Sequence, residues 1–301
     1  MDERTMVDAH GVTVFTRWWP VDAPAGVVLI SHGASEHSGR YDRFARALNA
    51  AGFAAAALDH RGHGRTVPAP GPARMGPGGG RAVIDDLHEL RAAAATEFGA
   101  DVPVLLFAHS MGSLIGLGYL TAHSAGLAGA VLCGFAADLA QSDDLAAFLR
   151  AAADDAGRDT PAAILAANNA AFEPARTPYD WLSRDPDEVD RYIADPMSGD
   201  GNPLTYGYLV DLFDALGPSR ERLGDIACPV LVIAGEQDPA AAMGAHARGL
   251  ADLLRAADVP VDMTIYPDAR HELLNETNRD EVTADVVAWL RRHADGSTPS
   301  P

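Results

Sequence analysis

The segment from Pro103 to Gly112 constrains the fold of this chain of 301 residues more than any other. Its apolar run ends at Ser110, and a segment with helical character, from Leu114 to Leu120, follows. A strand that turns directly into a helix leaves little room for side chains beside the turning residue. Ala108 and Gly112, two positions before and after the serine, are small enough for such a turn. The pattern predicts a presented serine hydroxyl, although an inert serine in the same turn fits the spacing equally well.

Short apolar runs of the kind that is buried on both faces of a parallel sheet recur along the chain. Segments with helical spacing of apolar residues separate most of them. This alternation predicts an α/β fold, with a mostly parallel central sheet flanked by helices. The expected strands cover residues 12–19, 25–30, 53–58, 104–107, 128–133, 230–234 and 261–266, the last at a sheet edge.

The alternation stops between about residues 137 and 224, where helical pieces rich in Ala, Asp and Leu are interrupted by prolines. We therefore expect residues 1–136 and 225–295 to form the core and residues 137–224 to form a helical cap, or lid, over the carboxyl edge of the sheet. Residues 296–301 are expected to be a disordered tail. The apolar cap residues either line a ligand channel or pack on the core: Leu145, Phe148, Leu149, Ile164, Leu165, Phe172, Trp181, Leu182, Tyr206, Leu209 and Phe213.

Composition limits the partners and the location. The 42 acidic and 23 basic residues give a net charge of −19, which argues against binding to nucleic acid or to anionic lipid surfaces. No apolar run reaches the ~18–20 residues of a membrane span. The acidic start, Met1 to Thr5, lacks the apolar core of a signal peptide, so we expect a cytoplasmic protein. Cys133 and Cys228 are expected to be buried small hydrophobes, and we expect neither metal nor cofactor.

Carboxylates and a histidine follow Ser110 in the chain order serine, acid, histidine, which is typical of a catalytic serine at a strand-to-helix turn of this kind. A hydroxyl becomes nucleophilic when a histidine accepts its proton and a carboxylate orients that histidine. Asp238 follows the expected strand 230–234, at the edge where open parallel sheets bind ligands. It is the expected carboxylate; Glu236 is the next candidate, and a turn-initiating role is the alternative for Asp238. His271, in the loop after the next strand, is the expected base.

Two backbone N–H groups are expected to stabilise the oxyanion of the reaction. One belongs to Met111, at the N-terminus of the helix after the serine, where the helix dipole favours negative charge. The other belongs to Ala34, in the loop after the first buried strand, where Gly33 allows the backbone to approach closely. His32 and His109 are expected to brace these loops without transferring protons.

Two further segments carry charged residues without a predicted catalytic role. The segment from Asp59 to Gly64 contains an aspartate and two histidines, which would suit a metal or a second acid, but its glycines favour a tight structural loop. Glu276 is expected to hold the start of a helix.

Four segments occur in an ordered set: HGASEHSGRY at residues 32–41, DHRGHG at 59–64, HSMG at 109–112 and HELLNE at 271–276. From about residue 10 to 293 the chain resembles the monoacylglycerol lipase/lysophospholipase branch of the α/β-hydrolase superfamily. The resemblance implies the α/β-hydrolase fold, the catalytic triad Ser110, Asp238 and His271, and the oxyanion donors Ala34 and Met111. The chain departs from the pattern of this branch at three positions: Ala108 and Ser35, where glycine is usual, and Arg65, where serine is common.

The expected activity is hydrolysis of a small-molecule carboxylic ester with a single acyl chain, through an acyl-enzyme on Ser110. A peptidase would use the same residues with an acidic anchor for a substrate amine, and an acyltransferase would differ in excluding water. A non-catalytic ligand-binding protein is the alternative from another class, although a receptor has no need of all three residues. Acyl-chain length, lid mobility and oligomeric state stay open at this point.

Overall fold

The computed structural model describes residues 1–68, 71–162 and 167–295. Two of the expected cap residues, Ile164 and Leu165, and the expected tail 296–301 lie outside these ranges. Cys133 and Cys228 are both buried free thiols. None of the helices in the described ranges combines the length and apolarity that crossing a membrane requires.

The centre of the molecule is an eight-stranded sheet in the order β1-β2-β4-β3-β5-β6-β7-β8. The pairs β1/β2 and β2/β4 are antiparallel, and all other pairs are parallel. The predicted mostly parallel sheet is therefore confirmed. The strands are β1 (Asp2–Val7), β2 (Thr13–Trp19), β3 (Gly26–Ser31), β4 (Phe53–Leu58), β5 (Val104–His109), β6 (Leu127–Cys133), β7 (Val230–Gly235) and β8 (Val261–Tyr266).

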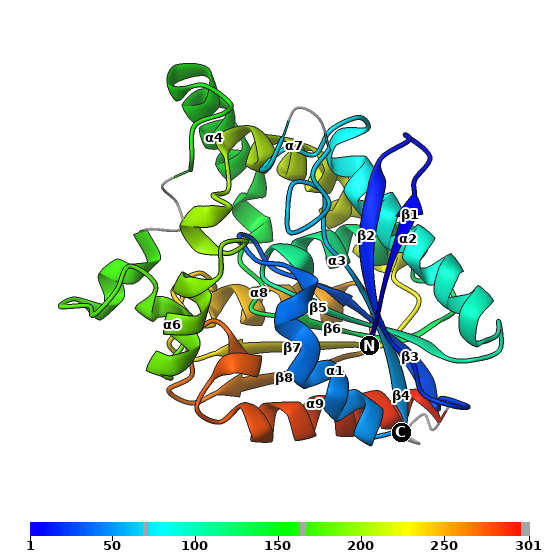
Figure 1. Ribbon diagram of the computed structural model, residues 1–301. Helices are drawn as coiled ribbons and strands as arrows, with labels where there is room; N and C mark the ends of the chain where they lie inside the picture. Colours follow the sequence, from blue (N-terminus) through cyan, green and yellow to red (C-terminus); the bar gives the residue numbers. More distant parts are fainter. Residues whose placement is uncertain (69–70, 163–166, 296–301) are drawn as a thin grey trace.

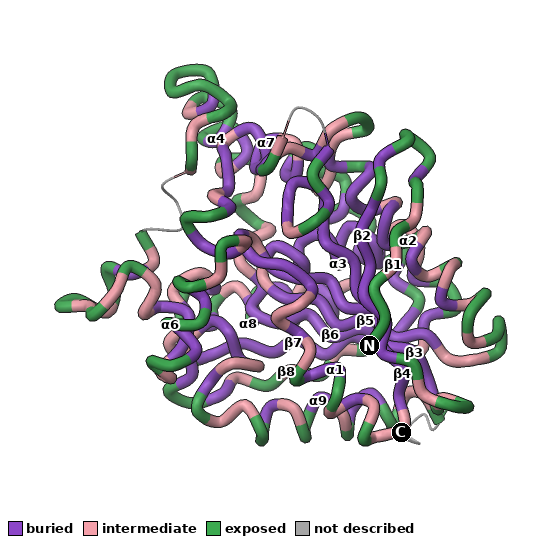
Figure 2. Tube along the Cα trace, viewed as in Figure 1, coloured by how far each residue is buried: buried purple, intermediate pink, exposed green. Residues whose placement is uncertain are grey.

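Helices cover both faces of the sheet, and the buried residues concentrate on the strands between them (Figures 1 and 2). Neighbouring strand residues point to opposite faces. In β3, Leu29 packs in the cluster that includes α2, α3 and α8, whereas Val28 packs in the cluster that includes α1 and α9. The helices are α1 (Asp42–Ala50), α2 (Gly79–Phe98), α3 (Met111–His123), α4 (Ser142–Ala156), α6 (Pro186–Ala194), α7 (Tyr206–Leu216), α8 (Ala245–Ala256) and α9 (Arg279–Ala294).

Between β6 and β7 the described chain contains helices and loops and adds no strand to the sheet. This segment contains α4, α6 and α7, together with short 3-10 turns at Leu139–Gln141, Asn168–Phe172, Asp180–Leu182, Gly199–Gly201 and Gly217–Asp225. Helix α7 packs against α4. It also packs against α2 and α3, two of the helices that flank the sheet (Figure 1). We call residues 137–224 the cap; the division of the chain into core and cap stays a prediction.

Candidate active site

Ser110 sits at the turn between β5 and α3. Its φ of 52° and ψ of −120° are unusual for a residue with a side chain, so the surrounding packing must hold this turn. A Cβ at Gly112 would lie 2.2 Å from the carbonyl oxygen of Ser31, because α3 begins directly against the end of β3. The sharp turn and this close approach explain why the sequence is small around Ser110.

Ala108 stands where glycine is usual, and helix α3 leaves room for its methyl group. Ala108 is fully buried on β5, and a Cβ at Gly116 would come within 2.9 Å of the Ala108 Cβ. Gly116, on the second turn of α3, thus leaves the space that the Ala108 methyl group occupies. The turn survives the missing glycine because the facing helix supplies one.

The structure brings Ser110, His271 and Asp238 into one hydrogen-bonded line. His271 Nε2 is 2.8 Å from Ser110 Oγ, and His271 Nδ1 is 2.8 Å from Asp238 Oδ2. The other carboxylate oxygen of Asp238 accepts the backbone N–H groups of Ala240 and Ala241, so the turn-initiating role is present at the same time. One oxygen holds the turn while the other faces the imidazole.

Glu236, the second candidate for the acid, is not part of this line. Its side chain is exposed and accepts a hydrogen bond from the backbone N–H of Asp268. Both residues lie near the end of β7, but only Asp238 is turned inward. Spacing along the chain could not separate them, because they differ by two positions in the same loop.

The electrostatic surroundings favour a basic imidazole at His271. Burial by itself lowers the pKa of His271, but the Asp238 carboxylate, with Glu272 and Glu36 further away, raises it above the ordinary value of 6.5. The His109 ring lies 4.8 Å from the His271 ring, centroid to centroid. Burial lowers the pKa of His109 to about 4, so this neighbour is uncharged near neutral pH.

The loop after β3 lies against Ser110. A Cβ at Gly33 would be 3.2 Å from the Ser110 Cβ, and Ala34 lines the same cavity as Ser110 and Met111. Within the part of the chain that the structure describes, the backbone N–H groups of Ala34 and Met111 donate to no protein acceptor. They are therefore free to bind an oxygen atom in this cavity.

Histidine and aspartate side chains brace this loop from behind. His32 Nε2 accepts the backbone N–H of His60 at 2.8 Å, so its Nδ1 carries the proton and donates to the Gly33 carbonyl at 2.7 Å. Asp59 accepts the backbone N–H groups of Ser38 and Arg65. These contacts agree with a structural role for the Asp59–Gly64 segment.

An arginine that the sequence argument did not single out joins the two loops on either side of Ser110. Arg40 binds both carboxylate oxygens of Glu272, at 2.6 and 2.8 Å, and one oxygen of Glu36 at 2.7 Å. Glu36 also accepts the Gly33 N–H at 2.5 Å. Burial raises the pKa of Glu272, but the Arg40 guanidinium outweighs it and lowers that pKa to about 2. The pairing with Glu272 joins segments 232 residues apart, so no local pattern in the sequence indicates it.

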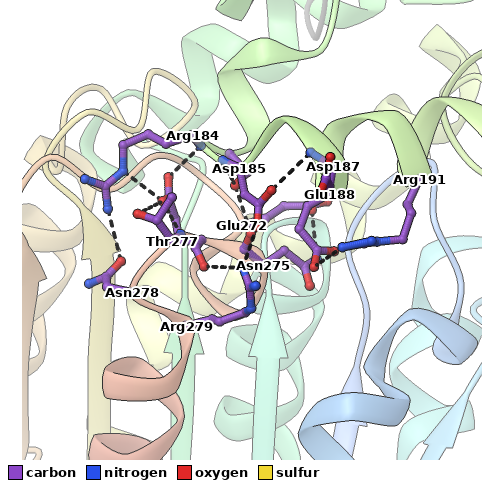
Figure 3. Close-up of polar contacts among 12 residues, drawn as sticks. Arg184, Asp185, Asp187, Glu188, Arg191, Glu272, Asn275, Thr277, Asn278 and Arg279 are labelled. Atoms are coloured by element: carbon purple, nitrogen blue, oxygen red, sulfur yellow. Dashed lines mark hydrogen bonds and ion pairs between the residues drawn. The ribbon is translucent and has the colours of Figure 1, made fainter.

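A second polar network joins the loop of His271 to the cap. The buried carboxylate of Glu276 accepts the backbone N–H groups of Arg184 and Arg270, at 3.0 and 2.9 Å, and the Arg184 Nε at 2.8 Å. Figure 3 shows the neighbouring contacts of Arg184 with Asn278 and of Asp185 with Arg279. Glu276 therefore connects two distant segments. It also accepts the backbone N–H of Thr277 at 2.8 Å, close to the start of α9, as its expected role at a helix start requires.

Ser110 opens into an apolar cavity of about 400 Å³ between the sheet and the cap. Of the expected cap residues, four line it: Leu145, Leu149, Leu209 and Phe213. Phe148 does not line it and is 60% exposed. The Trp181 ring lies 4.9 Å from the His271 ring, beside the expected base. Leu114, Leu204 and Leu212 complete the apolar walls, and Asp138 and Asp144 are among the few polar groups.

Fold and site together define an α/β-hydrolase, with Ser110 presented at the end of β5 and hydrogen-bonded to His271. The chain belongs to the family described as "Serine aminopeptidase, S33", whose model matches residues 22–278. The resemblance to the monoacylglycerol lipase branch that the sequence predicts is also confirmed.

Three relatives illustrate that branch. The chain is 33% identical to a monoacylglycerol lipase of Mycolicibacterium smegmatis, over 97% of each chain. It is 29% identical to the monoglyceride lipase of Homo sapiens, over 98% of this chain and 93% of that one. Among solved structures, it is similar to a thermostable carboxyl esterase from Bacillus coagulans, with a TM-score of 0.86, 28% identity and coverage of 97% and 98%.

Proposed function

We propose that this chain hydrolyses carboxylic esters of small molecules that carry a single acyl chain, monoacylglycerols among them, through an acyl-enzyme on Ser110. The observation that carries the proposal is the line Ser110–His271–Asp238 opening into an apolar cavity. Ligand sites of this kind combine apolar walls with a few placed polar groups. The similarity to lipases and an esterase supports the same reaction. The cytoplasmic location stays a prediction.

In the proposed mechanism, Ser110 Oγ attacks the ester carbonyl carbon while His271 Nε2 takes the hydroxyl proton. The N–H groups of Ala34 and Met111 stabilise the negative charge on the carbonyl oxygen. The bond to the alcohol breaks as His271 returns the proton to the leaving oxygen. A water molecule, deprotonated by His271, then attacks the acyl-enzyme, and the acid leaves as the proton returns to Ser110. Asp238 keeps His271 Nδ1 protonated throughout.

The test is Ser110→Ala, assayed with p-nitrophenyl butyrate and with a monoacylglycerol. We expect kcat to fall by about 10⁴-fold or more, because the nucleophile is lost while the fold is kept. Ser124→Ala, at the far end of α3, is the matched control and should retain activity. Full activity in Ser110→Ala would refute the assignment.

A peptidase is the second candidate, because the matching family model is described as an aminopeptidase and two aspartates line the cavity. A substrate amine would need a free carboxylate. Both oxygens of Asp138 are already engaged, one by the Ala140 N–H and one by the Gln141 amide, each at 2.8 Å. Asp144 also lines the cavity and makes no hydrogen bond or ion pair among the described residues, so it remains available as that carboxylate, and the substrate panel decides between the two candidates.

Substrate panels separate the remaining candidates. Faster cleavage of aminoacyl-naphthylamides than of esters would favour the peptidase, and transfer to added alcohols in preference to water would favour an acyltransferase. A folded protein that turns over neither substrate and is not labelled by a fluorophosphonate would be a ligand-binding protein.

A further inference from the structure

A second cavity lies directly behind the first. It measures about 320 Å³ and is bounded by the same helices, α3, α4 and α7, that line the cavity at Ser110. Figure 1 shows α4 and α7 next to each other, and α7 also packs on α3. The two cavities share the side chains of Leu114, Phe213 and Ala137, each of them at most 8% exposed.

Helix geometry puts the two cavities in series. Along α3, Ser110 and Leu114 are four residues apart, and Leu117 follows three residues later and lines only the second cavity. At 1.5 Å per residue, the shared residue Leu114 is about 6 Å along the helix from the serine, and Leu117, which lines only the second cavity, is about one turn farther. Along α7, Leu209 faces the first cavity, Phe213 faces both, and Leu216 faces the second.

The second cavity has an apolar floor and a charged rim. Leu117 and Phe135 are buried in the floor, whereas Arg150 and Asp214 pair at the rim with about half of each side chain exposed. A methylene chain that passed the wall would thus find apolar surface before it reached solvent.

We propose that Leu114 and Phe213 form the end wall of the acyl site and set the longest acyl chain that it accepts, and that the cavity behind them takes the terminal methylenes of longer chains once the wall is opened. This inference rests on the proposed ester hydrolysis. Each methylene that is newly buried contributes ~0.8 kcal/mol, which corresponds to about a fourfold gain in kcat/KM per methylene.

The experiment measures kcat/KM for p-nitrophenyl esters from acetate to palmitate. Phe213→Ala removes the Phe213 side of the wall and Phe213→Leu reduces it, while Leu114 stays in place. The smaller change provides a variant that folds if the larger cavity destabilises the first. Phe148→Ala is the matched control, because Phe148 is an exposed aromatic residue of the same cap that faces neither cavity. Thermal unfolding checks that each variant is folded.

The expected result is an optimum at longer chains in the Phe213 variants, with a gain of about fourfold per added methylene, and an unchanged optimum in Phe148→Ala. An unchanged optimum in folded Phe213→Leu and Phe213→Ala would overturn the inference and leave the proposed hydrolysis standing. If the unmodified protein cleaved no ester of the series, the proposed function itself would fail, and the inference with it.

Discussion

Ala108 and Gly116 show how single residues on facing elements keep the turn at Ser110. The space for the Ala108 methyl group exists because position 116 has no side chain, and the two Cβ positions would otherwise be 2.9 Å apart. The sequence signalled Ala108 as a departure from the usual pattern. The sequence does not reveal that Gly116 makes room for Ala108, because this contact exists only when β5 packs on α3.

This pair makes a double-mutant prediction. Gly116→Ala should lower the free energy of unfolding by ~1–2 kcal/mol, because overpacking outweighs the gain in helix propensity. Adding Ala108→Gly should restore most of the loss, since it removes the methyl group in the way. Urea unfolding of the four proteins measures the coupling. Additive effects of the two substitutions would show that these residues do not share the space.

At His271 the prediction concerns pH. The proposed base must be neutral to accept the Ser110 proton, and its pKa is raised above 6.5 because the Asp238 carboxylate outweighs burial. Activity should therefore rise with pH through a midpoint above 6.5. In Asp238→Asn that midpoint should move down, and kcat should fall by about 10⁴-fold. Profiles of kcat/KM against pH measure the midpoint and the loss of rate. A midpoint that Asp238→Asn leaves unchanged would contradict the pairing of His271 with Asp238.

At the scale of elements, the site depends on loops held by buried charges. Arg40 connects the loop after β3, through Glu36, to the loop that carries His271, through Glu272. All three side chains are at most 11% exposed, so the removal of Arg40 leaves two buried carboxylates without the positive charge that they face. The precision of the line from Ser110 to Asp238 follows from such contacts as well as from the sheet.

Arg40→Met tests this connection. It should lower stability at neutral pH by ~3–5 kcal/mol and reduce kcat, because both buried glutamates lose the guanidinium that balances their charge. The pKa of Glu272 in the folded protein, about 2, lies below its ordinary value of 4.5. Its contribution to stability is thus fully present above about pH 4.5 and is lost as the pH falls towards 2. In Arg40→Met that part of the acid-unfolding profile should flatten.

The control for this prediction is Arg46→Met, which removes an exposed arginine from the neighbouring helix α1. It should leave stability and the acid-unfolding profile nearly unchanged. An equal loss of stability in the two variants would mean that Arg40 contributes no more to stability than an arginine in an exposed ion pair.

The elements differ in how well the sequence predicts them. Strands β3 to β7 are apolar except for Ser31 and His109 at the ends of β3 and β5, since both faces are covered, and the sequence predicts their positions within two residues. Strand β1 was missed because its charged residues and half-exposed pattern suit the edge of the sheet and resemble a polar tail. The roles of Glu276 and Arg40 depend on partners about 90 and 230 residues away, which no local pattern reveals.

At the scale of the whole molecule, the net charge of −19 is the dominant feature. Most arginines are paired with carboxylates, so the excess negative charge is spread over the surface and repels itself. Raising the salt concentration from ~10 mM to ~100 mM shortens the Debye length from ~30 Å to ~10 Å. The Tm should therefore rise with salt. A fall in Tm would show that surface ion pairs contribute more than the repulsion costs.

The most direct test of the account is covalent trapping of the nucleophile. A p-nitrophenyl alkylphosphonate, whose phosphorus replaces the ester carbonyl carbon, is incubated with the protein, and the modified residue is identified by intact mass and peptide mapping. We expect one alkylphosphonyl group per chain, on Ser110, and no labelling of Ser110→Ala or of denatured protein. Labelling at another residue, or ester hydrolysis that persists while Ser110 stays unmodified, would contradict the account.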